Sequence, residues 1–515
     1  MVLSRVLKTL SSARQSVSQA ALYLSFFALL QKFLSVLQQI LIGRLFGISA
    51  DADAFFVAQA VPFMLGGMIA ISLTTSLVPV VSRRPELRPG VLAGLALSLV
   101  GMLLSFSLLS LVLDSAVIGV LGYGLTEGTA ATAERLFALM SSLFILMGSS
   151  GMLTAIFHAG SRFLVPAVAA CLPYLGGIGG LFLLKPILGI GGLAWGLIIG
   201  AAGELLLLSL FVEREWLQRP VFQAQAWRDL LRTFVPVLVC TAVSTLYLVI
   251  DRSFATAFPT GYVSSFNFAG NLMTIPLQMV VTNIAVALFP SLVSLRARKI
   301  DFATLFGNAL VWAVFLVVPG LVIVRTWSQP LVRLLFHSES FDMSAVNLTS
   351  TVLMAYSYAL VGLTLKDMSS IALIALGRER WPMLIGVGSL ALSILLKLAL
   401  VPRFGYLAIA YSTDVACACN GLILLWFLSR LLGLDWRRLG YIAGKMLVAG
   451  AVMVAYWLLF RHIAAVDRGP SSWVYLVTSG GVYLLACVAL RLPQPGLLWQ
   501  RVASIGHRVW SGVRR

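Results

Sequence analysis

The stretch Ile187–Val212, with the sequence ILGIGGLAWGLIIGAAGELLLLSLFV, decides the fold class. Glu204 is its only charged residue. A helix needs about 20 consecutive, mostly apolar residues to cross the hydrocarbon core of a bilayer. Membrane-barrel strands would instead alternate polar and apolar residues in much shorter segments. This stretch therefore predicts a transmembrane helix.

The rest of the 515-residue chain follows the same pattern. Hydrophobic residues make up 60% of it and charged residues 11%, whereas soluble proteins carry about 25% charged residues. The mean hydropathy of +0.97 is too high for a water-facing surface. The candidate spans are 20–46, 53–81, 91–113, 131–158, 162–185, 187–212, 233–258, 262–294, 302–326, 345–376, 381–402, 404–429, 439–460 and 472–490. We therefore predict an all-α integral membrane protein with fourteen transmembrane helices.

The basic residues of the chain predict its orientation. The net charge is +18, but these residues gather in short breaks between apolar runs, so we interpret them as topology signals and expect no nucleic acid partner. Arg83, Arg84, Arg298 and Arg437 lie in breaks on one face, which we expect to be cytoplasmic because such loops are enriched in Lys and Arg. Both termini belong to this set, which predicts an N-in, C-in topology in a bacterial cytoplasmic membrane.

Three segments outside the spans are expected on the cytoplasmic side: an amphipathic N-terminus (1–19), a linker (214–232) and a basic tail (492–515). In the tail, Trp499, Val502 and Trp510 recur at roughly helical spacing with arginines between them. This pattern predicts an interfacial helix on the anionic cytoplasmic leaflet.

The two halves of the chain resemble each other. Matching segments are Phe55–Ala58 with Phe266–Ala269, Leu77–Pro79 with Leu288–Pro290, and Pro166 with Pro382. We interpret 20–213 (helices 1–6) as an N-lobe, 233–430 (helices 7–12) as a C-lobe, and 431–491 as two added helices. Six spans in each half make the repeats parallel. Such repeats are typical of transporters that alternate access to a site between their lobes.

Several of these stretches resemble the MurJ/MviN family of flippases for lipid-linked cell-wall precursors, within the MOP superfamily of MATE antiporters and Wzx-type flippases. The resemblance covers about residues 20–430 and rests on Ile42–Gly47, Asp53–Ala58, Pro62, Val78–Pro79, Phe258–Gly261, Asn271–Met273, Pro276 and Gly192–Gly196. It implies a V-shaped bundle with a central cationic cavity for the diphosphate and sugars of an undecaprenyl-linked substrate. Enzymes of envelope biosynthesis would be its partners.

The first predicted helix carries the strongest cavity candidates. Lys32 lies near mid-membrane, where a charge costs about 2.5–3.5 kcal/mol on insertion scales and so suggests function. Ser35 and Gln39 share its face, and Gln38 extends a second polar stripe. By the resemblance, Lys32, Gln38 and Gln39 stand where the family has two arginines and an aspartate. We expect Lys32 to hold a diphosphate, with a packing or snorkelling lysine as the alternative.

Charged and polar residues on later spans are weaker candidates. The resemblance places Asn271 where the family has an arginine, and aligns Lys366 with a basic position. Asp367, next to Lys366, is a candidate for ion coupling, with an internal ion pair as the alternative. Glu204 is the other coupling candidate, with helix packing as the alternative. Lys397 is expected to snorkel near the outer end of its helix.

Acid–base residues also stand at corresponding outer ends of the two halves. Arg44 and Asp53 flank the first outer loop, and Asp251 and Arg252 lie at the similar place in the second half. We expect them to close an outer gate, with interfacial anchors as the alternative.

The sequence predicts a transporter and not an enzyme. It has no P-loop, and its five cysteines and four histidines show no metal-site spacing. We therefore expect no cofactor and no metal, and coupling to the membrane potential or to an H+, Na+ or Cl− gradient. The expected function is translocation of an undecaprenyl-diphosphate-linked saccharide of the lipid II type. Alternatives are a Wzx-like exporter of an exopolysaccharide or O-antigen unit, a MATE-like cation-coupled antiporter of small molecules, and a polysaccharide polymerase or glycosyltransferase.

Overall fold

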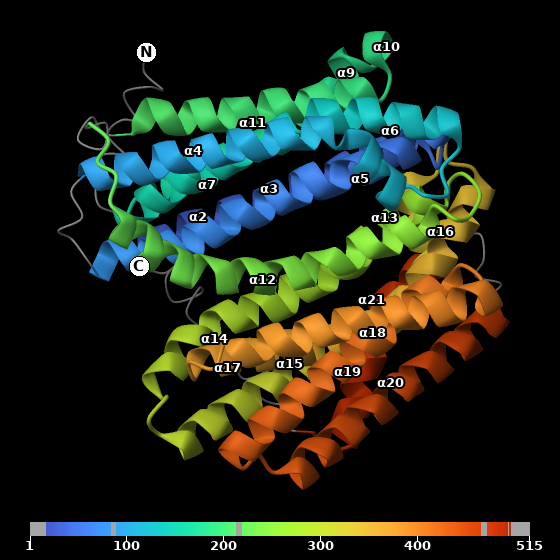
Figure 1. The fold of residues 1–515 in the computed structure, drawn as a ribbon. Coiled ribbons are helices and arrows are strands. Elements are labelled where there is room, and N and C mark those ends of the chain that lie inside the picture. Colours follow the sequence, from blue (N-terminus) through green and yellow to red (C-terminus); the bar gives the residue numbers. More distant parts are fainter. Residues whose placement is uncertain (1–16, 84–88, 213–218, 465–470, 493, 496–515) are drawn as a thin grey trace, which may run out of the picture. The chain divides into compact units, whose positions relative to one another are not determined.

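A computed structural model describes residues 17–83, 89–212, 219–464, 471–492 and 494–495 of the chain. Within these ranges every regular element is a helix (Figure 1). Eleven helices are long and apolar enough to cross a membrane, or thirteen if two bent pairs count as one span each. The predicted class, an all-helical multi-span membrane protein, is confirmed. The fourteenth predicted span coincides with α21, whose apolar part is shorter, so the number fourteen stays a prediction.

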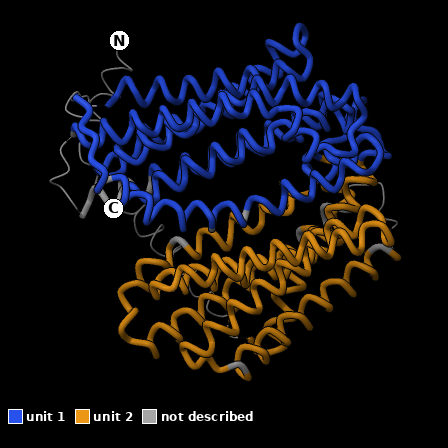
Figure 2. Tube along the Cα trace, viewed as in Figure 1, with its two compact units in different colours: residues 1–268, 335–345 blue, residues 269–334, 346–515 orange. Residues whose placement is uncertain are grey.

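The helices form two compact units (Figure 2). Unit 1 comprises residues 1–268 and 335–345, and unit 2 comprises residues 269–334 and 346–515. The helices of unit 1 are α2 (Val17–Phe46), α3 (Ala50–Arg83), α4 (Pro89–Val112), α5 (Asp114–Leu121), α6 (Glu127–Met140), α7 (Ser142–Ala159), α8 (Leu164–Ala169), α9 (Leu172–Leu183), α10 (Lys185–Leu188), α11 (Gly191–Phe211), α12 (Ala224–Ala255) and the first part of α13 (Tyr262–Leu277).

Unit 2 begins within α13 and contains the remaining helices. These are the π-helical turn η2 (Gln278–Thr282), α14 (Asn283–Ser294), α15 (Lys299–Phe336) up to Leu334, α16 (Met343–Tyr356) from Val346, α17 (Ala359–Ala375), α18 (Arg380–Phe404), α19 (Leu407–Leu432), α20 (Trp436–Ala464) and α21 (Ser471–Ala489). The predicted lobes follow the sequence repeat, whereas the units follow packing, which joins α12 to α3 in unit 1.

Each unit has its own apolar core. In unit 1 the core lies between α3, α4, α7 and α12, with Leu77, Leu99 and Met152 among its buried members. In unit 2 the two last helices pack against α15 through Met446, Met453 and other buried side chains. The Tyr483 hydroxyl donates a hydrogen bond to the Phe315 carbonyl, 3.1 Å away. This bond satisfies a polar group that would otherwise be buried without a partner.

The outward-facing surface is apolar, as a lipid-facing protein requires. Leu183, Ile187, Leu210 and Leu485 are each more than two-thirds exposed. In water such side chains would be costly, but a bilayer removes the cost because its interior is apolar too.

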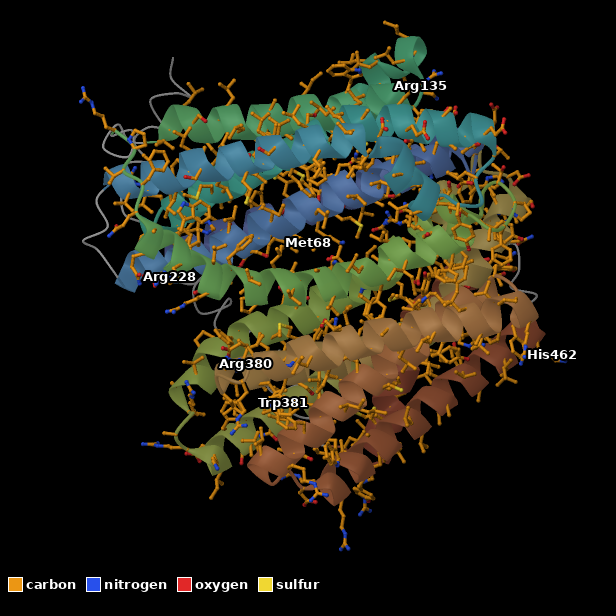
Figure 3. All side chains as sticks on the ribbon, viewed as in Figure 1. Met68, Arg135, Arg228, Arg380, Trp381 and His462 are labelled. Carbon is orange, nitrogen blue, oxygen red and sulfur yellow. The ribbon has the colours of Figure 1, made fainter. Side chains whose placement is uncertain are left out.

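Each unit has two opposite ends. Figure 3 shows Arg135 and Arg228 at opposite ends of unit 1, and Arg380 and His462 at opposite ends of unit 2. The predicted topology assigns Arg228 and Arg380 to cytoplasmic breaks, and it stays a prediction. The predicted interfacial helix of the tail, within 492–515, and most of the predicted N-terminal segment 1–19 lie outside the described residues.

Several predicted spans are broken or bent, two of them at a proline. The fifth predicted span divides into α8 and α9, and Pro173 stands at the start of α9 without an N–H group to donate. The eighth contains Pro276 and then the π-helical turn η2. The tenth predicted span, 345–376, bends by 45° between α16 and α17. Broken membrane helices are tolerated where protein or a polar cavity surrounds the freed backbone.

Candidate functional site: the polar face of α2 and the ends of α2 and α3

Three of the four polar candidates on α2 contact other helices of unit 1. The Ser35 hydroxyl shares a hydrogen bond with the Tyr174 hydroxyl on α9. Gln38 is buried, and its amide nitrogen lies against Gly177, too close to leave room for a Cβ there. The Gln39 carbonyl accepts a hydrogen bond from the side-chain amide of Asn267 on α13, at 3.1 Å. Packing therefore uses most of the polar stripe.

Lys32 differs from these neighbours. It is partly buried in an apolar helix. No side chain or carbonyl in the described part of the chain forms a hydrogen bond or ion pair with its ammonium group. A charge in such surroundings is costly and calls for a partner. Of the residues on this face, Lys32 is therefore the one whose charge is available to a ligand.

Asp53 caps a helix of the other half of the chain. Its carboxylate is 2% exposed and accepts hydrogen bonds from the backbone N–H groups of Gly261 (2.6 Å) and Ser264 (2.7 Å), and from the Ser264 hydroxyl. These groups belong to the first turn of α13, where N–H groups have no intrahelical partner. Gly261 has a φ of +97°, and a Cβ there would lie 2.8 Å from the Ile48 carbonyl, so both the backbone and the space favour glycine.

The other outer-gate candidates lie near the same helix ends. We call this region the junction and define it as residues 44–53, 251–264 and 335–341. The Nε group of Arg44 donates to the Leu335 carbonyl at 2.8 Å, and the Ser338 hydroxyl donates to the Arg44 carbonyl at 2.9 Å. Asp251 and Arg252 are buried at the end of α12. The hydrogen bonds of Asp53 and Arg44 reach backbone or hydroxyl groups of other segments, so the junction ties these segments together. A gating role for the four residues stays a prediction.

Lys185 adds a further bond beside the junction. Its ammonium group donates to the Leu45 carbonyl at 3.3 Å and lies 5.1 Å from the centre of the Phe46 ring. A cation at the last carbonyls of a helix is favourable because that end carries partial negative charge.

In unit 2, Lys366 and Asp367 form the internal ion pair that was the alternative interpretation. The Lys366 ammonium lies 3.2 Å from an Asp367 carboxylate oxygen, with the lysine almost fully buried in α17. Asn271 lies one turn beyond Asn267 on α13 and is partly buried. Binding roles for Lys366 and Asn271, and ion coupling by Asp367, stay predictions.

Lys397 was expected to snorkel, and that expectation is wrong. Its side chain is fully buried, with 0% exposure. The ammonium donates to the Ser393 hydroxyl on its own helix, and to the Thr413 hydroxyl on α19 at 2.8 Å. Asp414, the next residue on α19, is also buried. Hydropathy could not reveal this, because it does not say which way a helical residue faces.

Unit 2 also contains a cavity of about 1120 Å³ between α14, α15 and the start of α20. Its lining is mostly apolar, including Ile284 and Trp312, with Arg438 as a cationic member. Asp435 accepts backbone hydrogen bonds from Arg437 and Arg438 at 3.0 and 3.1 Å and so caps α20. The described residues contain no group of three or more His, Cys, Asp or Glu side chains that could hold a metal ion.

The sequence analysis did not identify two residues that contact the polar face of α2. Tyr174 bonds Ser35 and Asn267 bonds Gln39. Asn267 lies in a segment that the internal repeat matched, but the repeat did not indicate its contact with Gln39. Tyr174 gave no signal, because a tyrosine in an apolar helix is common.

Comparison with known proteins places the chain in a family. The family model described as "Lipid II flippase MurJ" matches residues 42–477. The lipid II flippase MurJ of Burkholderia cenocepacia is 24% identical over 473 residues, covering 87% of this chain and 90% of the relative. A probable lipid II flippase MurJ of Bdellovibrio bacteriovorus is 25% identical over 511 residues, covering 93% and 94%.

Solved structures give the same fold. A lipid II flippase MurJ in an inward closed conformation superposes with a TM-score of 0.79 at 19% identity, covering 91% of this chain and 98% of that one. An inward-facing MATE family transporter of the MOP superfamily gives 0.71 at 13% identity, covering 80% and 98%. The family match extends over most of the chain and agrees with the predicted resemblance: the chain belongs to the lipid II flippase MurJ family, a family of membrane transporters.

Proposed function

We propose that this chain translocates lipid II, an undecaprenyl-diphosphate-linked saccharide precursor of peptidoglycan, across the bacterial cytoplasmic membrane. The observation that carries the proposal is the family match over residues 42–477, which includes most of the helices of both halves. The two relatives named above, at 24% and 25% identity over most of their length, are described as a lipid II flippase and a probable lipid II flippase.

Lys32 is the residue that we assign to the diphosphate. Its ammonium has no hydrogen-bond or ion-pair partner in the described part of the chain, and the other charged residue of α2 is Arg44, near the helix end. An ammonium group binds phosphate oxygens as a compact point charge with three donors. Asn271 and Lys366 are proposed to contact the head group, with Ser35, Gln38 and Gln39 shaping the polar face of α2. Their bonds to other helices make the shaping role the natural one for Ser35 and Gln39.

The junction is proposed to act as the outer gate in an alternating-access cycle with both termini on the cytoplasmic side. Asp53 holds the first turn of α13, and Arg44 holds the end of α15. Opening toward the outside would break these bonds, and rebinding would close the path behind the released head group. Energy would come from the membrane potential or an ion gradient. Enzymes that make and use lipid II are the proposed partners.

Complementation tests the substrate. The gene is expressed in a bacterium whose own lipid II flippase can be shut off, and both growth and lipid II at the outer leaflet are followed. A Lys32→Ala variant, checked for equal membrane abundance, is the matched control. Rescue by the wild-type chain and not by the variant supports the proposal. Abundant wild-type protein that leaves lipid II inside contradicts it.

Neutral residues at cavity positions favour a second candidate, export of another polyprenyl-linked saccharide. Gln38, Gln39 and Asn271 stand where the resemblance implies charged residues. Restored exopolysaccharide or O-antigen display in a strain lacking its own exporter, together with failed lipid II exposure, would establish this second function.

A further inference from the structure

Helices α9 and α11 touch through their backbones. Gly192, Gly196 and Gly200 recur every four residues along α11 and so share one face. A Cβ added at Gly196 would lie 2.8 Å from the Cα of Gly180, and one at Gly200 would lie 2.7 Å from the Cα of Pro173. Small residues at such spacing let membrane helices approach closely. The glycine face therefore fixes how α11 is turned toward α9.

Glu204 is the next residue in this series, one turn beyond Gly200. The two helices run antiparallel, since Gly196 meets Gly180 while Gly200 meets Leu172 and Pro173, the first residues of α9. One turn further, Glu204 must lie beside the break between α8 and α9. Consistent with this, the Glu204 carboxylate interacts electrostatically with Cys171 in that break and with Tyr174 in the first turn of α9.

The carboxylate has no protein partner that would hold it as an ion. Glu204 forms no hydrogen bond and no ion pair with any described residue. The other ionisable residues on helices packed against α11 are Glu127, Glu134, Arg135, His158 and Lys185, and none of them has such a bond to Glu204 in the described ranges. Cys171 and Tyr174 are themselves weak acids. A lone partly buried carboxylate in such surroundings is neutralised by taking up a proton.

Tyr174 connects this site to α2. It interacts with Glu204, and its hydroxyl shares a hydrogen bond with Ser35 on α2. Lys32 lies three residues before Ser35 and therefore on the same helix face. A change of charge at Glu204 can thus alter a contact of the helix that carries the proposed head-group ligand.

We propose that Glu204 is the proton site of this transporter, and that a proton moves inward through it for each head group moved outward. This rests on the proposed function, which it extends to the coupling ion. The carboxylate takes up a proton from the outer side to become the neutral acid, and releases it to the cytoplasm after the head group has left.

Two measurements on the full-length chain test the proton site, one without substrate and one during lipid II flipping. The first is infrared difference spectroscopy of the purified protein between alkaline and acid buffer, which detects protonation of a carboxyl group without any substrate. The second is lipid II flipping in unidirectional proteoliposomes under an imposed pH gradient, acid outside, with the membrane potential clamped. The variants are Glu204→Gln, Glu204→Asp and, as matched control, Glu127→Gln, because Glu127 is an exposed carboxylate in unit 1.

We expect a buried carboxylic acid band in the wild type and in Glu127→Gln that is lost in Glu204→Gln. The gradient should accelerate flipping by the wild type and Glu127→Gln, and Glu204→Gln should lose the acceleration. Glu204→Asp, which keeps an acid, should retain the band and part of the acceleration, which separates loss of the proton from loss of folding.

The infrared band tests the proton site, and the effect of the pH gradient tests its coupling to lipid II flipping. A Glu204→Gln variant with an unchanged band, or with wild-type acceleration by the gradient, overturns the proton site. Acceleration by a sodium gradient and not by a pH gradient also overturns it. A Glu204-dependent band in a protein that moves no lipid II under any gradient would leave the proton site supported and contradict the proposed function instead.

Discussion

Two lysines in apolar helices, one in each unit, have opposite surroundings. Lys397 in α18 is fully buried and donates hydrogen bonds to the hydroxyls of Ser393 and Thr413. Lys32 in α2 is partly buried, and its ammonium bonds no described residue. The first charge is used inside the protein to join α18 to α19. The second joins α2 to no described residue through a hydrogen bond or ion pair.

The comparison separates a charge that bonds its own protein from one that bonds no described residue. Both charges carry a desolvation cost, larger for the fully buried Lys397, and each cost has to be offset. Where the protein supplies the oxygen atoms, as at Lys397, removal of the charge should affect stability. Where it does not, as at Lys32, removal should affect ligand binding and leave the fold alone.

The largest expected loss of stability follows from Lys397→Met. The change leaves the buried hydroxyls of Ser393 and Thr413 without the ammonium group that donates to them. We expect unfolding to become easier by about 3 kcal/mol, as when one partner of a buried charged group is removed. Unfolding in mixed detergent micelles measures it. Leu398→Met, at a 60% exposed neighbour, is the control and should change little.

Asp53→Ala tests whether a buried acid can be structural in the same way. The variant leaves the backbone N–H groups of Gly261 and Ser264 without their acceptor. Hydrogen bonds to charged groups contribute about 1.5–3 kcal/mol, so we expect a loss in that range by the same unfolding assay. Asp51→Ala, in the same first turn of α3 but exposed, is the matched control. Equal effects of the two variants would show that the cap on α13 is unimportant.

Gln39→Ala removes a neutral bond from the same helix as Lys32. Its carbonyl accepts a hydrogen bond from Asn267, so we expect a loss of about 1 kcal/mol. A double-mutant cycle with Asn267→Ala isolates the pair, since residues in contact show non-additive effects. If the two losses in the free energy of unfolding add fully, the bond between Gln39 and Asn267 contributes nothing to stability. Gln39 would then be as available to a ligand as Lys32.

Lys32→Ala should have the smallest effect on stability. Because Lys32 has no described partner to lose, the free energy of unfolding should change by no more than about 0.5 kcal/mol. It should rise if removal of an unpaired charge relieves a desolvation cost. A loss above about 1 kcal/mol would place Lys32 with Lys397 among the structural charges.

Hydropathy alone predicted the membrane class and the position of nearly every helix, because the length of an apolar run is set by the bilayer. It did not predict the extent of α15, which continues to Phe336 where the predicted span ended at 326. Arg325 explains the difference: its guanidinium donates to the Met354 carbonyl at 3.2 Å and lies over the Tyr358 ring at 4.8 Å. These contacts within unit 2 pair a charge that the sequence pattern had placed at the end of a helix, so α15 continues past it.

The candidate site was less predictable than the fold. Lys32 and Lys397 are both lysines within apolar runs, and sequence alone does not show which way each of them faces. That orientation depends on distant packing, such as the hydroxyl of Thr413 on a neighbouring helix. The Gln39–Asn267 bond joins residues 228 positions apart and could not be read from local pattern.

Binding of lipid II to purified Lys32 variants tests the central claim most directly. The claim predicts that Lys32→Gln, folded and as stable as the wild type, binds lipid II more weakly by about 2 kcal/mol or more, which is roughly 30-fold in Kd. Lys32→Arg, which keeps a cation, should retain most of the affinity. Equal affinities of the wild type and Lys32→Gln would contradict the assignment of Lys32 to the diphosphate.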